Sequence, residues 1–556
     1  MDDGRFGLDR VGTKGGPHRG GLPAAVFDRR LSRREILGLA ARLGISTASL
    51  GLVLEACSTA KPSATSTAAG PSTSTGSHPR RGGTLTGGVS GGSSADTLDG
   101  QDPVTNADFA RVNSLFQPLA GLDTAAQLKL VLAESIEPNA DATSWVVRLK
   151  PGITFHNGKD LTADDIIFSF QREVNPKDPL PGATGLVPVD VAAMKKLDPL
   201  TVSIPCHTPF STFVETIAQV GYGNIVPVGF DPKNPVGTGP FRYKSFTPGA
   251  QSTFVRYTDY WETGLPYLDE LVLTDVADET TQVSGLVGGQ FDVVDLLSSS
   301  STGTVLSGGA RLLIAEGGGW TPFTMRVDLR PFSDVRVRQA LRYLVDRPEM
   351  INLVFDGHGT IGNDLFSIWD PNYDHELPQR VQDIPRAKHL LKAAGYENLT
   401  LQLVTADIAQ GTVLAAQVFA QQAQAAGVNV QLNKVTVTDF YGSSYLKWPF
   451  AQDYWYYTYY LPQVSDATLP NAPFNECHFD NARYSALYNE ALKRVGAAAR
   501  ADIVHEMQQI DYDEGGYIIP YFPPVIDGYA ASVHGLVPSK VGVSLGNFDF
   551  SRVWID

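Results

Sequence analysis

The sequence predicts a mixed α/β fold for the chain from residue 83 onward. Short runs of β-branched and aromatic residues alternate there with segments whose apolar residues recur at helical spacing. This alternation argues against a helix bundle and against an all-β sandwich. Hydrophobic residues make up 43% and charged residues 19% of the 556-residue chain, so it can bury substantial cores. The length suggests two to four domains.

A strand pattern followed by a capped helix marks the first part of this fold. Residues 145–149 read Trp-Val-Val-Arg-Leu, and the turn residues Pro151 and Gly152 follow them. Thr162 is placed to cap a helix that has Asp164 and Asp165 in its first turn.

Helices and strands alternate again between about residues 330 and 440. A helix is predicted after Ser333 and Asp334, and Pro348 is expected to end it. Pro385 is placed at the start of another helix, and Gly395 at its end. A helix over about 413–427 leads into a strand pattern at 428–432. This alternation indicates a separate domain.

The charge balance and the cysteine content exclude several classes of protein. Lys and Arg number 44 against 59 Asp and Glu, which gives a net charge of −15 and argues against nucleic-acid binding. The three cysteines form no CxxC pair, and no HExxH is present. Cys477 and His478 offer at most two adjacent ligands, so we expect no metal site. The sequence leaves open whether Cys206 and Cys477 form a disulfide.

Two strings resemble catalytic or cofactor motifs but have the wrong context. Residues 88–92 match GxSxG, yet a nucleophile elbow needs a helix directly after the serine, and the following residues read as a loop. Residues 357–362 match GxGxxG, yet a helical segment, not a strand, precedes them. We therefore expect no catalytic residues and no cofactor.

The first 56 residues have the order of a signal peptide: a basic stretch, a mildly apolar run at 36–54 and small residues before Cys57. Arg33 and Arg34 lie in a run that resembles a twin-arginine export signal. Residues 54–57 resemble a bacterial lipoprotein box, in which Cys57 would be lipidated. A membrane-spanning helix is the alternative, although Arg42 near the middle of the run would be costly.

Residues 57–83 are expected to be a lipidated, flexible tether. Residues 58–83 are almost all Ser, Thr, Ala, Pro and Gly, a composition with too little apolar surface to fold. We therefore expect an extracytoplasmic protein that a lipid holds at the outer face of the cell membrane.

Three segments together resemble one family. The string at 145–165, the Val-Gly-Thr-Gly-Pro-Phe at 236–241 with Tyr260 and Trp261 downstream, and residues 332–347 occur in the family's order. They resemble the family 5 extracellular solute-binding proteins of ABC importers, which include dipeptide, oligopeptide and nickel binders. The resemblance covers most of residues 83–556.

This resemblance implies a two-lobed periplasmic-binding-protein-like fold of cluster C (type II), with an extra subdomain in the first lobe. Ligand would be enclosed between the lobes, and two crossover strands near 319–327 and 520–529 would form the hinge. The implied division is lobe I at 84–320 with its extra subdomain at about 115–235, lobe II at 321–525, and a C-terminal return to lobe I at 526–556.

The function that the resemblance implies is a non-catalytic receptor. It would bind a peptide or peptide-like solute and pass it to a membrane permease driven by ATPase subunits, because the chain has no GxxxxGK[ST] of its own. We expect a monomer. The alternatives are a binder of a metal chelate, an oligosaccharide or an aromatic metabolite, and an extracellular lipoprotein hydrolase.

Six aromatic residues among the seven at 454–460 mark the candidate site. As a strand, this run would send Tyr454 and Tyr456 to one face and Trp455, Tyr457 and Tyr459 to the other. The sequence leaves open whether these faces meet the core or the cleft.

In peptide-binding relatives this region resembles a Trp followed three residues later by an Asp that pairs with the peptide's amino terminus. Thr458 stands at that position, which favours a neutral or aromatic-stacking solute unless Asp364 or Asp466 supplies the acid. We expect the aromatics to stack on the solute and Asn363 and Asp364 to hydrogen-bond to it. The candidate ligand-binding residues are Trp320, Asn363, Asp364, Tyr454, Trp455, Tyr456, Tyr457 and Thr458.

Overall fold

The structure is a computed structural model that describes residues 78–219, 221 and 223–556. The predicted export arginines Arg33 and Arg34, the predicted lipidation site Cys57 and residues 57–77 of the predicted tether lie outside these residues. Among the described residues, every helix is too short or too polar to cross a membrane.

A seven-stranded sheet organises the first half of the molecule, in the order β12-β20-β11-β1-β10-β9-β8. Strand β1 pairs in parallel with β10 and β11, and the other pairs are antiparallel. Helix α2 contacts β1, β8 and β10, and α5 contacts β1, β11 and β20. The elements are β1 (Thr84–Val89), α2 (Asn106–Leu115), β8 (Phe241–Thr247), β9 (Gln251–Arg256), β10 (Glu270–Asp275), α5 (Glu279–Val287), β11 (Val293–Val294), α6 (Thr302–Ser307), β12 (Arg311–Glu316) and β20 (Pro524–Tyr529).

A separate antiparallel sheet in the order β4-β5-β7-β6 forms a subdomain of this half. Its core gathers Trp145, Val147 and Leu149 of β5 against Ile166 and Phe170 of α3. The elements are β2 (Ala120–Leu122), β3 (Leu128–Leu130), β4 (Ala133–Pro138), β5 (Ser144–Leu149), α3 (Ala163–Glu173), β6 (Lys195–Asp198), β7 (Thr201–Pro205), α4 (Phe213–Ile217) and two short 3₁₀ turns, Pro181–Ala183 and Val191–Ala193.

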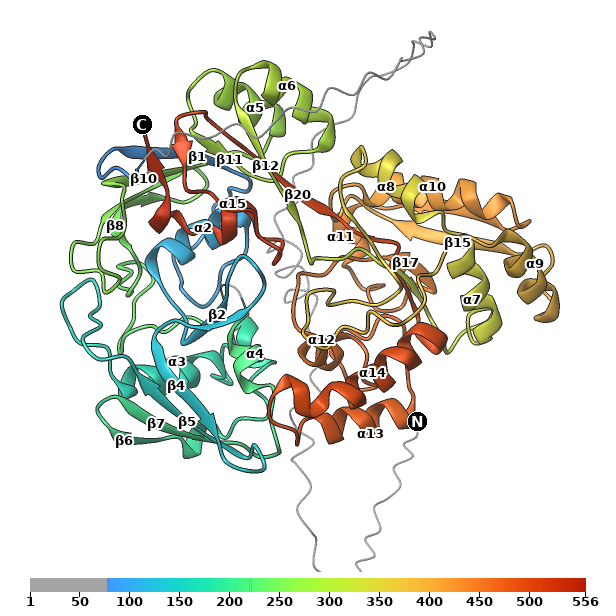
Figure 1. The fold of residues 1–556 in the computed structure, drawn as a ribbon, viewed down its shortest axis with the longest axis horizontal. Coiled ribbons are helices and arrows are strands. Elements are labelled where there is room, and N and C mark those ends of the chain that lie inside the picture. The colour runs from blue at the N-terminus through green and yellow to red at the C-terminus, as the bar shows by residue number, and fades with distance from the viewer. Residues whose placement is uncertain (1–77, 220, 222) are drawn as a thin grey trace, which may run out of the picture.

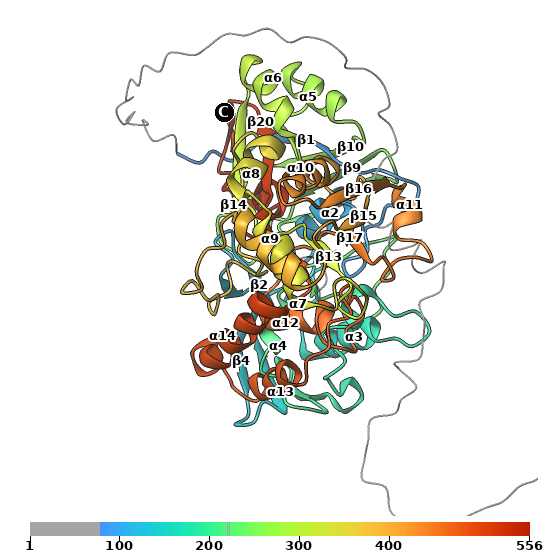
Figure 2. The same cartoon turned by 90° about the vertical axis from the view of Figure 1, so that its right-hand side faces the viewer.

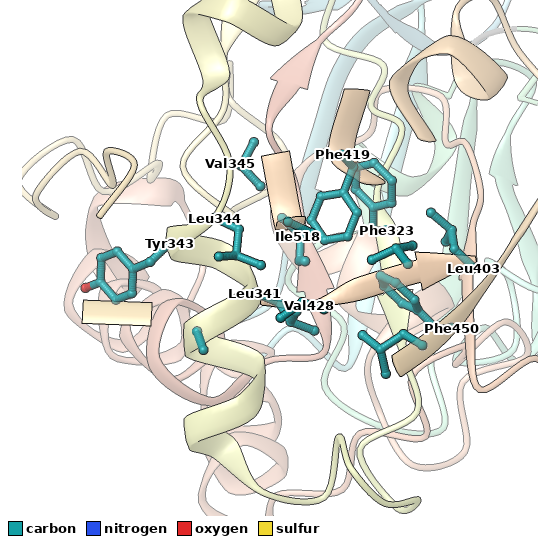
Figure 3. Close-up of a cluster of buried hydrophobic side chains, with 14 of the residues drawn as sticks. Phe323, Leu341, Tyr343, Leu344, Val345, Leu403, Phe419, Val428, Phe450 and Ile518 are labelled. Atoms are coloured by element: carbon teal, nitrogen blue, oxygen red, sulfur yellow. The ribbon is translucent and has the colours of Figure 1, made fainter. Parts of the chain in front are cut away.

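The second half is built on a five-stranded sheet in the order β16-β15-β17-β13-β18. Phe323 of β13, Phe450 of β17 and Phe419 of α10 pack together in its core, as Figure 3 shows. The elements are β13 (Phe323–Met325), α7 (Val335–Tyr343), α8 (Arg347–Phe355), β14 (Thr360–Ile361), α9 (Ile384–Ala393), β15 (Thr400–Thr405), α10 (Thr412–Gln424), β16 (Asn429–Lys434), α11 (Val437–Phe440), β17 (Phe450–Gln452), α12 (Tyr460–Ala467), α13 (Ala482–Ala491), α14 (Ala497–Glu514), β18 (Tyr517–Ile518) and β19 (Tyr521–Phe522).

The chain passes between the two sheets twice. It leaves β12 of the first sheet for β13 of the second through residues 317–322, and it returns from β18 of the second sheet to β20 of the first through residues 519–523, which include β19. Strands β12 and β20 pair along six residues, and Figure 1 shows them running together between the two halves. The crossings expected near 319–327 and 520–529 overlap these passages.

The last segment packs back on the first half. Val533, Leu545 and Phe548 lie in the same core cluster as β1 and α2. At the far end of the molecule, Arg500 of α14 forms a buried ion pair with Glu215 of α4, and Figures 1 and 2 both place α13 beside the subdomain. The remaining elements are β21 (Val533–His534), α15 (Ser544–Asn547), β22 (Trp554–Ile555) and the 3₁₀ turns Ser299–Ser301 and Phe550–Arg552.

Most of the predicted elements are confirmed, with two corrections. The helix after Thr162 is present as predicted, and Thr162 and Asp165 form a capping box at its start. The helix after Asp334 ends at Tyr343, before Pro348, and this proline instead lies in the first turn of α8, where its missing N–H costs nothing. The aromatic run is not a strand, because it makes one isolated bridge and then enters α12 at Tyr460.

The cysteines of the described residues do not pair. Cys206 and Cys477 are both free thiols. Cys206 packs against the subdomain core, whereas Cys477 is buried in the core beneath α13 and α14.

Candidate functional site

A cavity of about 580 Å³ lies between the two halves of the molecule. One wall comes from the first half, through the loop after β1, the start of α2 and residues of α5. The other wall comes from the second half, through residues 407–410 and 454–458. Both crossings and residues 541–544 also contribute to the lining. The cavity therefore contacts both halves and the two crossings about which the halves could rotate.

Trp320 and Trp455 are joined by backbone and by ring contacts in one wall. Each residue's N–H donates to the other's carbonyl, at 3.0 and 2.8 Å. Their indole rings stack with centroids 5.7 Å apart and planes 9° apart. Trp320 is 1% exposed and stacks on Phe366 behind it, so it supports the half-buried Trp455.

Tyr454 and Tyr456 lie on the same side of the run, as the period of an extended chain predicts. Their rings meet edge to face at 5.6 Å. Tyr456 is 43% exposed, and its ring lies 6.3 Å from Phe109 of α2, which belongs to the opposite half. An aromatic contact thus spans the cavity from one half to the other.

Tyr457 and Thr458 also line the cavity. Tyr457 is buried, and its hydroxyl makes no hydrogen bond among the described residues. A Cβ at Gly318 of the first crossing would lie 2.6 Å from the Tyr457 ring, so only glycine lets the crossing approach so closely. The Thr458 hydroxyl donates to Gln463 Oε1 at 3.0 Å.

A polar network in the first half holds three of the residues that line the cavity. Asp295 is fully buried and accepts hydrogen bonds from Ser90 Oγ, Asn106 Nδ2 and Gln282 Nε2, at 2.8, 2.9 and 2.8 Å. Burial raises the pKa of Asp295, although these donors lower it. The network fixes the amide side chains that line the cavity.

Two acidic side chains line the cavity, one from each half, and sequence reasoning missed both. Glu279 Oε1 accepts from the N–H and hydroxyl of Ser298 at 2.8 and 2.7 Å. Asp407 is largely exposed and pairs with Lys434 at 2.9 Å. No Lys, Arg or His is among the described lining residues. Only the fold brings these acids together, because 127 residues separate them and no motif marks either.

Asn363 and Asp364 do not line the cavity and are not part of the candidate site. Asp364 is fully buried between Arg347 and Arg380, both 2.8 Å away, and these guanidinium groups lower its pKa against the effect of burial. Asn363 accepts from the Arg380 N–H at 2.8 Å. Their side chains are committed to the second half's own structure and lie outside the cavity lining, which speaks against the prediction that they bind the solute.

Asp466, the other acid considered, is also away from the cavity lining. Burial raises its pKa to about 7. Among the described residues, no group of three or more His, Cys, Asp or Glu side chains is arranged to hold a metal ion.

A family model for the bacterial extracellular solute-binding proteins, family 5, matches residues 127–469. The glutathione-binding protein GsiB of Escherichia coli K12 is 29% identical over 329 residues, and an E. coli O1:K1 form is 30% identical over 325. Each match covers 56% of this chain and 61% of the relative, so the chain spans about three fifths of the length of these curated relatives.

Solved structures share the whole two-lobed fold. The ABC transporter substrate-binding protein CtaP of Listeria monocytogenes superposes with a TM-score of 0.75 at 20% identity, over 86% of this chain and all of that one. The oligopeptide-binding protein AppA of Bacillus subtilis, in complex with a nonapeptide, gives 0.69 at 20% identity, over 86% and 100%. At this identity the likeness shows the fold alone.

Proposed function

Because this chain belongs to the family 5 bacterial extracellular solute-binding proteins, we propose that it is a receptor of an ABC importer. It binds a peptide or peptide-like solute between its lobes and delivers it to a permease that ATPase subunits drive. The observation that carries the proposal is the cavity of about 580 Å³, which both halves and both crossings line. A cavity of this size at a domain interface is typical of small-ligand sites.

The lining suits a solute with an apolar or aromatic part and a cationic part. Tyr454, Trp455 and Tyr456 offer ring faces, which attract both aromatic groups and cations. Glu279 and Asp407 supply the acid that Thr458 lacks. The sequence favours a neutral or aromatic-stacking solute. Because these two acids line the cavity, the solute can also carry an ammonium group.

A non-peptide solute is the second candidate. It is favoured by Thr458, which lines the cavity and stands where peptide-binding relatives place an acid. An aromatic metabolite or an oligosaccharide would use the same ring faces without needing that charge.

The receptor acts outside the cytoplasm as a monomer, anchored through lipid at Cys57 after export directed by Arg33 and Arg34. The order of the first 57 residues supports this part of the proposal. Replacing Cys57 with Ala should move the mature protein from the membrane fraction to the soluble fraction. A processed variant that stays with the membrane would refute the anchor.

Calorimetric titration tests the binding site. Wild type should bind members of a library of tri- to pentapeptides at one site per chain, and Trp455→Ala should weaken that binding at least tenfold because it removes a ring face from the cavity. Trp261→Ala is the matched control, since Trp261 is also half-buried but packs against the subdomain core. Equal binding by both variants would refute the assignment.

A further inference from the structure

Two buried carboxyl groups lie directly behind the aromatic wall. Asp453 follows β17 and is 3% exposed. Its Oδ1 accepts from the Tyr441 hydroxyl at 2.7 Å and from the Tyr454 N–H at 2.8 Å. Glu476, from the loop between α12 and α13, is 5% exposed, and its Oε1 accepts from Trp455 Nε1 at 3.2 Å. The pair therefore touches two residues that line the cavity.

The second oxygen of each carboxyl group makes no hydrogen bond of ordinary geometry. Asp453 Oδ2 and Glu476 Oε2 are buried and have no partner among the described residues. The two carboxyl groups lie beside each other, and the hydroxyls of Tyr445 and Tyr517 lie beside Asp453 and Glu476, respectively. Two ionised carboxylates buried side by side would repel each other, so the pair favours keeping one proton.

The surroundings supply no other charge that would replace this proton. The titratable groups that face the pair are the phenols of Tyr441, Tyr445 and Tyr517 and the thiol of Cys477, and burial raises the pKa of each of them.

Arg342 of α7 packs against the same core, but its guanidinium donates to the carbonyls of Tyr517, Tyr512, Asp511 and Gly515. The phenols of Tyr441, Tyr445 and Tyr517 and the thiol of Cys477 have raised pKa values, so they stay neutral over the ordinary range of pH.

We propose that Asp453 and Glu476 share a single proton and that this proton holds the indole of Trp455 in its solute-binding position. The inference rests on the proposed function, because it assigns a pH response to the same cavity. Burial and the neighbouring acid both raise the pKa of Glu476. As the pH rises through that pKa the proton leaves, two buried negative charges repel, and Glu476 moves away with the hydrogen bond that orients the ring.

Glu476→Gln removes the proton that titrates but can keep the hydrogen bonds of the side chain. Its amide oxygen can still accept from Trp455 Nε1, and its NH₂ can donate permanently to Asp453 Oδ2. The variant should thus keep the Trp455 indole in place at every pH. Glu173→Gln is the matched control: Glu173 is also buried and unpartnered in hydrogen bonds, and burial raises its pKa to about 9, but it lies in the subdomain away from the cavity.

The first test uses the protein without solute. The emission due to Trp455, taken as wild type minus Trp455→Phe, should shift between pH 5 and pH 10. The neutral-carboxyl infrared band that wild type has in excess of Glu476→Gln should fade with the same midpoint. Glu476→Gln should lose the emission shift, and Glu173→Gln should keep it. An emission shift that persists in Glu476→Gln, or a wild-type emission that does not change, would overturn the inference.

The second test measures capture of the tri- to pentapeptide library by native mass spectrometry at pH 6 and pH 9. Wild type should capture at least tenfold less peptide at pH 9, and Glu476→Gln should capture equal amounts. Equal pH dependence in the two proteins would overturn the inference. Capture of nothing at either pH would count against the proposed function instead, and the solute-free emission would still decide whether the shared proton exists.

Discussion

Single residues divide into those that line the cavity and those that hold one half together from within, and they differ in whether their polar groups already have partners. Asp364 has both oxygens bonded to guanidinium groups and to the Ile519 N–H. Tyr456 and Trp455 keep exposed ring surface at the cavity. A sequence pattern identifies acidic and aromatic residues but not whether a partner has already used them.

Asp364→Asn should reduce the free energy of unfolding by about 3–5 kcal/mol, because it leaves two buried guanidinium groups without a countercharge. Urea denaturation followed by circular dichroism measures this change. Glu506→Gln, which breaks the exposed pair with Arg483, is the control and should cost at most about 1 kcal/mol. Similar losses in both variants would contradict the structural role given to Asp364.

The same carboxylate predicts how stability depends on pH. Its pKa is lowered in the folded chain, so its stabilising contribution is present above the ordinary pKa of an aspartate and is lost as the pH falls through the lowered value. The difference in unfolding free energy between wild type and Asp364→Asn should shrink in acid. A difference that grows as the pH falls would contradict this sign.

Thr458→Asp should add a third acid to the cavity lining, beside Glu279 and Asp407, and strengthen the binding of free-amino peptides about tenfold or more over their amino-acetylated forms. The added carboxylate would lie in the cavity lining, where water is partly excluded and an ion pair is stronger than at the surface. Calorimetric titration of matched free and acetylated tripeptides measures the preference. If the variant discriminates no better than wild type, the position does not face the solute's amino group.

At the scale of elements, the sequence predicts a helix correctly where the capping residues and the spacing of the apolar residues agree. The helix α3 begins after Thr162, and α9 begins with Pro385 in its first turn, as predicted. The prediction of a strand at residues 454–460 was wrong, because high strand propensity does not show whether a neighbouring strand is present to pair with. The sequence could place Trp320 and Trp455 in the site through the resemblance, whereas Glu279 and Asp407 required the three-dimensional arrangement.

Asp165→Ala should destabilise the subdomain by about 1–3 kcal/mol. Its carboxylate accepts from the N–H and hydroxyl of Thr162 at 2.9 Å each, and from the Val228 N–H at 2.9 Å, so the variant removes three hydrogen bonds around the half-buried start of α3. Asp164→Ala is the control, because Asp164 is exposed and pairs only with Lys196. Thermal unfolding should show a clear shift for the first variant and a small one for the second.

At the scale of the whole molecule, the two halves touch across the cavity as well as through the crossings. Gln410 Nε2 of the second half donates to the Leu297 carbonyl of the first at 2.9 Å, and Phe109 meets Tyr456 across the cavity. Together with the buried Arg500–Glu215 pair at the far end, these contacts hold the halves in the present arrangement beside two thin crossings, which suit a hinge that closes on a solute. Gln410→Ala should therefore favour an open form, seen as a larger radius of gyration in X-ray scattering without solute.

The central claim is that one solute is enclosed between the lobes without being changed. Small-angle X-ray scattering with a bound member of the peptide library, combined with mass spectrometry of that peptide after incubation, tests it most directly. The account predicts a smaller radius of gyration on binding, the recovery of the intact peptide in a ratio of one per chain, and the loss of both effects in Trp455→Ala. An unchanged radius with a tightly bound peptide, or a cleaved peptide, would contradict it.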